Sequence, residues 1–460
     1  MRPPAWFPAQ FVVGDGFTLP DLAGPGGAVT LGTTCYDTPD AALAHAGVSL
    51  RLDRAGTWSL LLPGRELRRP AAGAGVVPPD LLDVLTALHR GADLTAVRTV
   101  RSAVHVLSAA GGVLAEVRVL SGRGTGRRPR GVEVVLIDGG TGDLARIAAA
   151  LTAAGAVPAP PGSADGPDGS AGDLVTRAVG AGVARILRHD AVARVRGTMP
   201  DGDTPVHQMR VGTRRLRSDL QTFQPLLDPA WSRSLRAELS RLAGALGGAR
   251  DVEVLRARLR ATAAADPLAP LDAGAVERID AALAGRQETA LSALDEALRS
   301  PRYVPLLDAL VRPPRLAGRH AAPAARVLPG LVRKPWRRLH AAAGALTPDL
   351  PDDDWHEVRK LAKRARYAAD AAAPVVGVEA AVLAKRIAKA QKILGEHQDA
   401  ATAADTWLFV ARFLDRGDHD LAVTAGRLFE RERAAVTRAR AAFPAVWAAV
   451  CEENTTAWLR

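Results

Sequence analysis

The sequence predicts a two-domain protein, in which an N-terminal α+β domain of antiparallel strands precedes a large all-α domain. Strand-like runs separated by turn glycines occur before residue 157. A segment of proline, glycine, serine and aspartate then spans residues 157–173, has little to bury and is typical of a flexible linker. After it, nearly every long segment has the periodicity of a helix. We therefore expect domains at 1–157 and 174–460, joined by a linker at 158–173.

The N-terminal region alternates short strands with two helical segments. The strand-like runs, rich in β-branched and aliphatic residues, are 58–63, 102–108, 113–120 and 132–138. The helical segments are expected at about 80–90 and 143–155. Together, these strand-like runs and the two helical segments predict an α+β domain of antiparallel strands with accessory helices.

Composition and charge favour a folded protein with a polyanionic partner. The chain has 460 residues, 48% of them hydrophobic and only 4% aromatic, and its net charge is +11. Most of the basic excess follows residue 160. A basic excess of this kind suits nucleic acid, an anionic membrane or a phosphate polymer, although a merely soluble surface would also produce it.

The termini, the apolar runs and the cysteines bear on the compartment. The start of the chain lacks a continuous apolar core of signal-peptide length, and no run of about 18 apolar residues could span a bilayer. Cys35 and Cys451 are isolated, without the spacing of a disulfide framework or a metal site. We expect a cytoplasmic protein with no membrane partner.

A basic phrase occurs twice in the helical domain. His207-x-x-Arg210-x-x-x-Arg214-Arg215-x-Arg217 matches His356-x-x-Arg359-x-x-x-Lys363-Arg364-x-Arg366 at every charged position. The match continues downstream, where LGGARD (246–251) corresponds to LGEHQD (394–399). It also continues upstream, where Arg185 and Arg188 align with Lys334 and Arg337. The match predicts a duplicated unit, with repeats at about 174–300 and 320–455 that form two related helical bundles.

On a helical wheel the phrase forms a basic stripe. In the first copy Arg210, Arg214 and Arg217 lie roughly opposite the apolar side that carries Leu216 and Leu220. Cations so closely spaced repel one another, which a face serving only solubility would avoid by interleaving acids. We interpret the stripe as a polyanion-binding surface. The alternative is pairing with acids of neighbouring helices, such as Asp251 and Asp399.

The two stripes together make an extended basic track that suits a long polymer better than a compact ligand. Arginine forks and histidine donors are matched to phosphate oxygens. A further helix adds lysines at helical spacing. The candidate polyanion-binding residues are Arg185, Arg188, His207, Arg210, Arg214, Arg217, Lys334, Arg337, His356, Arg359, Lys363, Arg366, Lys385, Lys389 and Lys392.

Motifs for catalysis or metal binding are weak. His356-Glu357 begins like a zinc-protease motif, but position 360 is lysine, so the second histidine ligand is missing. His189-Asp190 has no companion histidines at metal spacing, and neither a P-loop nor a nucleophile elbow occurs. We therefore expect no catalytic residue, no metal site and no cofactor.

The tandem phrases and the LGxxxD echoes resemble the CHAD domain, the conserved histidine α-helical domain, over roughly residues 173–455. This resemblance implies two four-helix bundles related by pseudo-twofold symmetry, with a basic surface that binds inorganic polyphosphate. Association with polyphosphate granules is also typical of the family. The positions that match the family's histidines and basic residues are His207, His356, Arg210, Arg214, Arg217, Arg359, Lys363 and Arg366.

Residues 5–157 resemble a CYTH domain, the triphosphate tunnel fold, through YDTPDAALAHAGVSLR (36–51), GTWSLLLP (56–63) and GVEVVLIDG (131–139). The resemblance implies a barrel in which carboxylates hold a divalent cation and basic residues hold a triphosphate. The family's N-terminal ExExK falls here on Trp6, Pro8 and Gln10, its tunnel lysine on Leu61 and a late carboxylate on Val135. Arg51, Glu116 and Glu133 remain, too few for a hard cation. This indicates a pseudoenzyme, which stabilises the helical domain, docks a protein partner or holds a ligand without hydrolysing it.

The function that the sequence predicts is non-enzymatic binding of inorganic polyphosphate in the cytoplasm, at polyphosphate granules. The alternative of another class is a metal-dependent triphosphatase with a rearranged site built from Arg51, Glu116 and Glu133. A nucleic-acid partner is disfavoured, because the basic stripes carry no interleaved aromatic residues for base stacking and match no nucleic-acid motif.

Overall fold

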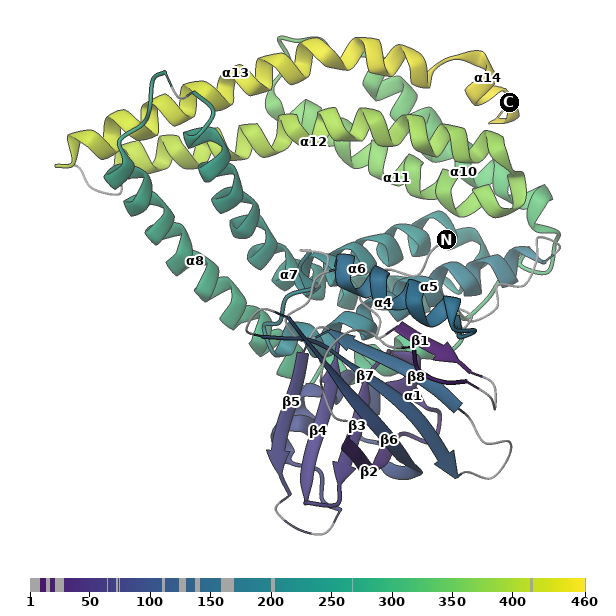
Figure 1. Ribbon diagram of the computed structural model, residues 1–460. Helices are drawn as coiled ribbons and strands as arrows, with labels where there is room; N and C mark the ends of the chain where they lie inside the picture. The colour runs from purple at the N-terminus through teal and green to yellow at the C-terminus, as the bar shows by residue number, and fades with distance from the viewer. Residues whose placement is uncertain are drawn as a thin grey trace. The chain divides into compact units, whose positions relative to one another are not determined.

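The chain forms two compact units in a computed structural model (Figure 1). The structure describes residues 9–13, 17–20, 29–63, 65–71, 73, 75–109, 112–123, 130–136, 141–158, 169–199, 203–266, 268–413 and 417–459. Unit 1 comprises Met1–Asp165 and Ala184–Met209, and unit 2 comprises Gly166–Val183 and Arg210–Arg460. The helices α5 (Ala171–Arg194) and α6 (Pro205–Thr222) therefore contribute residues to both units. Most of the predicted linker, residues 159–168, lies outside the described residues.

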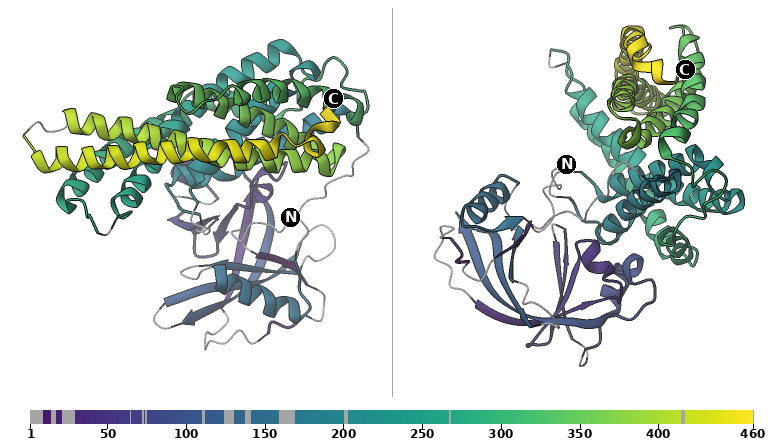
Figure 2. Two further views of the ribbon diagram at one scale, coloured as in Figure 1. Left: turned by 90° about the horizontal axis from the view of Figure 1, so that it is seen from above. Right: turned by 90° about the vertical axis from the view of Figure 1, so that its right-hand side faces the viewer.

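Unit 1 is built on one antiparallel sheet of nine strands in the order β5-β4-β3-β2-β6-β7-β8-β1-β9 (Figures 1 and 2). The strands are β1 Ala9–Val12, β2 Val29–Asp37, β3 Ser49–Asp53, β4 Thr57–Leu62, β5 Arg65–Pro70, β6 Thr95–Ala109, β7 Gly112–Arg123, β8 Arg130–Leu136 and β9 Val157–Pro158. The four strands expected from the sequence correspond to β4, β6, β7 and β8, and an antiparallel N-terminal sheet is confirmed.

Short helices cover parts of this sheet. They are α1 Ala42–His45, α2 Pro79–Val84, α3 Thr86–His89 and α4 Thr141–Ala153. Alternation along the strands places Val117, Val132 and Val134 on one face, where they pack against Ile147 and Leu151 of α4. A second core lies under β3 and β4 and includes Leu50, Trp58, Leu60 and Leu81.

The second core of unit 1 also contains residues that the sequence assigned to the helical domain. Ala191 and Val192 of α5 and Met199 beyond it are buried in that core. Asp190, fully buried, is held by Arg194 with 2.7 Å between its Oδ1 and the guanidinium Nε. Arg194 also lies 3.6 Å from Asp83 of α2. The adjacent His189 is buried as well, so this His-Asp pair belongs to a packed core.

Unit 2 is helical (Figure 1). Its longer helices beyond α6 are α7 Pro229–Ala263, α8 Ala273–Arg299, α9 Tyr303–Val311, α10 Ala324–Gly344, α11 Asp352–Val376, α12 Val378–Phe413 and α13 His419–Val450. The short elements η1 Gln224–Leu226, α14 Glu453–Thr456 and η2 Ala457–Leu459 complete it. Among the described residues, no helix combines the length and hydropathy required to cross a membrane.

Local sequence explains where several of these helices start and stop. Asp228, Asp272 and Asp418 cap α7, α8 and α13, each accepting a backbone hydrogen bond from the residue three positions later. Gly377 alone separates α11 from α12, with φ +100°, a conformation that L residues with a side chain rarely adopt. This single glycine turns the chain back on itself, so α11 and α12 pack as an antiparallel hairpin.

Two series of helices follow one another in unit 2 and its shared helices. The helices α5, α6, α7 and α8 correspond in order to α10, α11, α12 and α13. The longest member of each series, α7 and α12, has 35 and 36 residues respectively. Figure 2 shows α12 and α13 running side by side. A shared core joins the far ends of the long helices through Leu255 (α7), Ile279 (α8), Trp407 (α12) and Leu428 (α13). The mostly helical character of the C-terminal region is confirmed.

Candidate functional site

The basic stripes of α6 and α11 lie opposite buried apolar faces, as the helical wheel predicts. Leu216 and Leu220 of α6 and Phe223, the residue after its end, are fully buried. In α11 the buried positions include Trp355 and Ala362. Because these faces fill the core, the intervening cations of both helices are directed away from it, half-buried near the surface.

Four cations from the two repeats converge in unit 2, and we call them the cationic cluster: Arg210, Arg214, Arg359 and Lys363. Burial first, and then the charges of Arg359, Arg214 and Arg210, lower the pKa of Lys363 to about 7, and Asp399 opposes this shift. The pKa of Arg359 is also lowered, first by burial and then by the charges of Arg214 and Arg210, whereas Asp399 and Asp251 oppose the shift. The charges of these side chains act on one another's pKa values, which agrees with neighbouring positions in the fold.

The acids near the cluster compensate it unevenly. Arg210 donates to Oδ1 of Asp251 over 2.6 Å and to the carbonyl of Gly247 over 3.3 Å. Asp399 lies deeper, and burial raises its pKa more than the nearby Arg359 lowers it. In the described part of the chain, no carboxylate oxygen lies within 4.0 Å of the charged nitrogens of Arg359 or Lys363. Pairing with acids, the alternative reading of the stripe, therefore applies to Arg210 but not to Arg359 or Lys363.

Next to the cluster, α6 and α11 contact each other through polar groups. Nε of Arg214 donates to the Tyr367 hydroxyl over 3.0 Å, and the guanidinium of Arg215 lies 3.2 Å from Asp370. Arg215 also pairs at 3.1 Å with the buried Asp219. Burial raises the pKa of Asp219 to about 7, although the charge of Arg215 acts to lower it. These contacts tie the two repeats together.

Arg366, a predicted binding residue, belongs to the same contact region. Its guanidinium lies 4.9 Å from the ring centre of Tyr367, and its Nε is 3.6 Å from Asp370. The Nε atom itself is buried without a hydrogen-bond partner. Arg366 therefore stacks on the residue that joins the two repeats and stands beside the cationic cluster.

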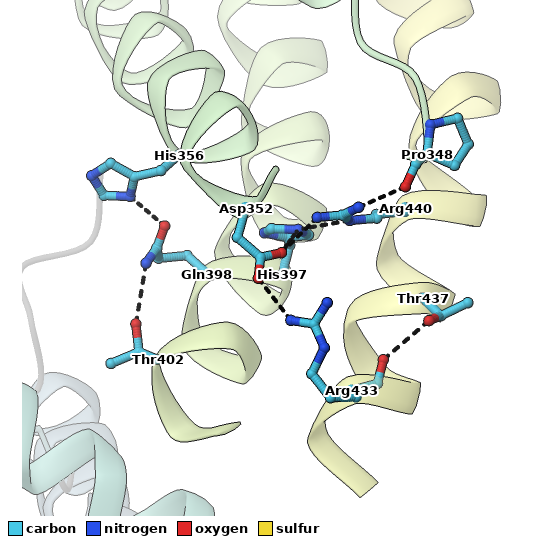
Figure 3. A network of polar contacts seen from close by, with 9 residues as sticks. All are labelled: Pro348, Asp352, His356, His397, Gln398, Thr402, Arg433, Thr437 and Arg440. Atoms are coloured by element: carbon cyan, nitrogen blue, oxygen red, sulfur yellow. Dashed lines mark hydrogen bonds and ion pairs between the residues drawn. The ribbon is translucent and has the colours of Figure 1, made fainter. Parts of the chain in front are cut away.

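A polar chain orients His356 (Figure 3). Its Nδ1 donates to the side-chain carbonyl of Gln398, whose amide nitrogen donates to the Thr402 hydroxyl over 3.1 Å. The amide oxygen of Gln398 is an acceptor in this arrangement, so Nδ1 of His356 carries the hydrogen. The other ring nitrogen, Nε2, takes no part in this chain of hydrogen bonds.

The first turn of α11 is held by a second, more buried network (Figure 3). Asp352 accepts from Arg433 over 2.7 Å and from Arg440 over 2.6 Å. His397 stacks on Trp355 with 5.1 Å between ring centres, and its Nε2 accepts from Arg440 over 3.1 Å. A neutral ring is required for that acceptor, which agrees with burial lowering the pKa of His397 to about 4. The network fixes the start of α11 four residues before His356.

The lysines of α12 continue the basic surface. Lys385, Lys389 and Lys392 are exposed, and they share one helix face with Asp399 farther along. On α10, Lys334 and Arg337 are also exposed. In the described part of the chain, none of these five side chains has a carboxylate within 4.0 Å.

Three predicted residues belong to unit 1. Arg185 donates to the Gln208 amide oxygen over 3.1 Å, and the pKa of Arg188 is lowered by burial and by the charge of Arg185. His207 lies in the first turn of α6, where its backbone N–H donates to the Thr204 hydroxyl over 3.2 Å. Arg217, on the unit 2 part of α6, has no carboxylate within 4.0 Å among the described residues.

The sites predicted in the N-terminal sheet are partly described. Trp6 and Pro8 lie outside the described residues. Gln10 pairs in register with Glu133, and Glu133 with Arg118. Arg51 is buried and donates through Nε to the Ser49 hydroxyl over 2.8 Å. Within the described ranges, no group of three or more histidine, cysteine, aspartate or glutamate residues is arranged to hold a metal.

The sequence reasoning missed several residues that shape the site. Tyr367 and Asp370 carry no basic charge and so escaped a search for stripes, although they join the repeats. Arg236 of α7 was missed because the second repeat has Ala384 at the equivalent position. Arg364 is absent from the predicted binding residues, yet its charge contributes to lowering the pKa of Arg236.

Comparisons with known proteins concern the family and the fold. The model of the CHAD domain family matches residues 177–408. Two curated relatives from Mycobacterium tuberculosis, strains CDC 1551 / Oshkosh and ATCC 25618 / H37Rv, are each 33% identical to the chain. The alignments cover 88% of this chain and 86% of each relative, and both relatives are named only as uncharacterized proteins.

Two solved structures share the fold. PptA from Streptomyces chartreusis is 27% identical, with a TM-score of 0.51 over 61% of this chain and 99% of its own. The CHAD domain from the plant Ricinus communis is 24% identical, with a TM-score of 0.50 over 63% of this chain and 94% of its own. The latter likeness concerns the fold alone.

Proposed function

Because the chain belongs to the CHAD domain family, we propose that it binds inorganic polyphosphate through the cationic cluster and does not turn it over. The observation that carries the proposal is the convergence of Arg210, Arg214, Arg359 and Lys363 with too few carboxylates to neutralise them. A folded protein keeps half-buried cations unpaired only at a cost in stability, and a bound polyanion would offset that cost.

The ligand is a polymer in this proposal, because the basic surface extends beyond the cluster. Lys385, Lys389 and Lys392 add exposed charges along α12, which runs antiparallel to α11. From Gln398 to Lys392 and from His356 to Lys363 the rise is about 9–10 Å along each helix, so the two lysines stand at similar heights. A chain of phosphates could therefore contact both helices in succession. We propose that the protein acts at cytoplasmic polyphosphate granules.

The test is a quadruple variant with a matched control. Arg210→Ala, Arg214→Ala, Arg359→Ala and Lys363→Ala together should weaken binding of polyphosphate of defined length, since each charge-assisted contact contributes up to about 1.5–3 kcal/mol. The control removes four exposed arginines that have no carboxylate within 4.0 Å among the described residues: Arg286, Arg312, Arg319 and Arg412. Equal losses in both variants, measured by calorimetry, would show that net charge alone governs binding.

Competition separates polyphosphate from nucleic acid. At matched phosphate concentration, unlabelled polyphosphate should displace a labelled polyphosphate probe, and duplex or single-stranded DNA should not. The cluster lacks aromatic residues arranged for base stacking, apart from Tyr367, which is buried. Displacement by DNA at equal potency would replace this proposal with a nucleic-acid function.

The salt dependence of binding provides a second measure. With roughly eight phosphate contacts, and DNA coefficients of about 0.7–0.9 per neutralised phosphate as a guide, the slope of log K against log salt should be near −6 to −7. A flat response would favour a compact ligand over a polymer.

For the N-terminal domain we propose a CYTH-like fold that is catalytically inactive, with a triphosphatase of rearranged site as the rival. In support, the register pairs Glu133 with Gln10 and Arg118, neither of which is an acid. The full-length protein should release no phosphate from tripolyphosphate with magnesium or manganese. The full chain is required, because Ala191, Val192 and Met199 complete the core of unit 1. Robust metal-dependent release would establish the rival.

A further inference from the structure

A second group of cations lies next to the cationic cluster: Arg217 on α6, Arg236 on α7 and Arg364 on α11. All three side chains are half-buried. Burial lowers the pKa of Arg236, and the charges of Arg217 and Arg364 lower it further. No carboxylate lies within 4.0 Å of any of the three guanidinium groups, within the described residues.

Hydrogen bonds on either side bring these three helices together at this level. The Ser232 hydroxyl of α7 lies 3.4 Å from the carbonyl of Leu220 on α6, whereas Arg210, earlier on α6, reaches Gly247, later on α7. The two helices are therefore antiparallel, and Arg217 and Arg236 each lie about one turn from the Leu220–Ser232 contact.

Helix α11 approaches from the other side. The hydrogen bond of 3.0 Å between Arg214 and Tyr367 joins it to α6, and Arg217 and Arg364 each lie three residues from a partner of that bond. The nearby acid Glu357 feels the charge of Arg364 but pairs at 2.5 Å with Lys360. The positive charge of the three arginines is thus left without a close counter-ion in the described structure.

We propose that Arg217, Arg236 and Arg364 form a second anion subsite that binds a phosphate group. Three guanidinium forks from three helices offer donors from several directions, as a tetrahedral phosphate requires. The subsite deepens the proposed function and rests on it, because the phosphate it takes is a further unit of the chain held by the cationic cluster. Arg217 stands one turn of helix beyond Arg214, and Arg364 directly follows Lys363, so the subsite adjoins the cluster. From Arg210 to Arg217 the helix rises about 10 Å, so only a ligand of several phosphates contacts the whole span.

Chain length is the property that this subsite controls. A long polyphosphate contacts the whole length of the cluster and the arginine subsite, whereas tripolyphosphate is long enough to contact only part of it. The subsite therefore confers a preference for long chains, because the second contact is made intramolecularly, at high effective concentration.

The experiment compares the parent with Arg236→Gln/Arg364→Gln in the full-length protein, by calorimetry with long polyphosphate, tripolyphosphate and pyrophosphate. The double variant should bind long chains about 10- to 100-fold more weakly. Its tripolyphosphate affinity should change by less than about threefold, because the cluster still binds that ligand. The matched control, Arg286→Gln/Arg312→Gln, loses the same charge from exposed positions and should bind long chains like the parent.

Two further readouts separate this proposal from its alternatives. Removing like charges should leave the thermal midpoint unchanged or raise it, so a large fall would mean that the arginines hold the fold together and would overturn the proposal. Unchanged binding of long chains, or an equal loss for long chains and tripolyphosphate, would also overturn it. If the parent bound no polyphosphate, the polyphosphate function would fail, and a loss of pyrophosphate binding confined to the double variant would still establish the subsite.

Discussion

The two repeats carry the same basic phrase in different surroundings. In the first, Arg210 closes an ion pair of 2.6 Å with Asp251, whose side chain is 64% exposed. In the second, Arg359 has no carboxylate within 4.0 Å in the described structure, and the corresponding acid, Asp399, is buried enough for its pKa to be raised. Duplication kept the sequence pattern but not its electrostatic balance. The second repeat is where an incoming anion would gain most, because its cations are the less compensated.

The largest expected effect comes from deleting the matched pair in each repeat. Arg359→Ala/Asp399→Asn should weaken polyphosphate binding by about 10- to 100-fold, since it removes an uncompensated cation. Arg210→Ala/Asp251→Asn should change binding by less than about threefold, because the ion pair with Asp251 already neutralises much of the charge of Arg210. Both variants leave the net charge unchanged, and calorimetry at one salt concentration measures the difference. Equal losses would show that the two copies contribute alike.

The next effect is the dependence of binding affinity on pH. It concerns Lys363, which occupies the position of Arg214 in the first repeat. The pKa of Lys363 is lowered to about 7, mainly by burial, whereas arginine stays charged at every pH of interest. A phosphate binds the charged form, so above that pH binding must take up a proton and affinity should fall, by at most tenfold per pH unit. The unfolded chain keeps this proton to higher pH than the folded one, so the stability of the free protein should rise above pH 7.

Lys363→Arg is the control for this pH dependence. It keeps a cation at the position and removes the titration, so the affinity profile between about pH 6 and 8.5 should flatten. Arg214→Lys should leave the parent's slope largely in place if the first repeat is the better compensated. The same slope in the parent and in Lys363→Arg would assign the titration to another group.

Sequence reasoning recovered the parts of the fold and site that repeat or alternate. Periodicity located the helices, alternation located β4, β6, β7 and β8, and the echo of the basic phrase located the residues of the cationic cluster. Such patterns involve residues close together in the sequence, so they can be recognised without the structure. Prolines do not mark the helix ends reliably in this chain. Pro335 and Pro444 lie inside α10 and α13, where packing of the buried helix face outweighs the lost hydrogen bond.

What could not be predicted depends on contacts distant in sequence. Nothing in the phrase shows that Arg210 meets an acid while Arg359 does not, because Asp251 and Asp399 occupy equivalent positions. The burial of Ala191 and Val192 in the core of unit 1 was equally hidden, since their helix reads as part of the helical domain. Burial and partner choice come from tertiary structure, and local patterns do not encode them.

A smaller effect tests how the repeats are joined. Tyr367 in the second repeat corresponds to Ser218 in the first. Tyr367 accepts from Arg214, whereas the buried Ser218 hydroxyl has no hydrogen-bond partner among the residues that the structure describes. Tyr367→Phe should lower the free energy of unfolding by about 0.5–1.5 kcal/mol. Ser218→Ala should be neutral or stabilising, since it removes an unsatisfied polar group. Chemical denaturation measures both, and equal losses would contradict this asymmetry.

The smallest expected effect concerns two helical glycines at equivalent positions of the two repeats. Gly247 of α7 and Gly395 of α12 occupy equivalent positions within helices, and a Cβ added at either meets no atom within 4 Å. Alanine at each position should therefore raise the free energy of unfolding by about 0.5–1 kcal/mol, chiefly by reducing the freedom of the unfolded chain. Binding should stay within about twofold of the parent in both variants, because nothing in the free protein is displaced. A loss of stability in either variant would mean that the position is more crowded than its surroundings indicate. A gain in stability with weaker polyphosphate binding in Gly395→Ala alone would place the phosphate chain against α12, on the less compensated side of the comparison.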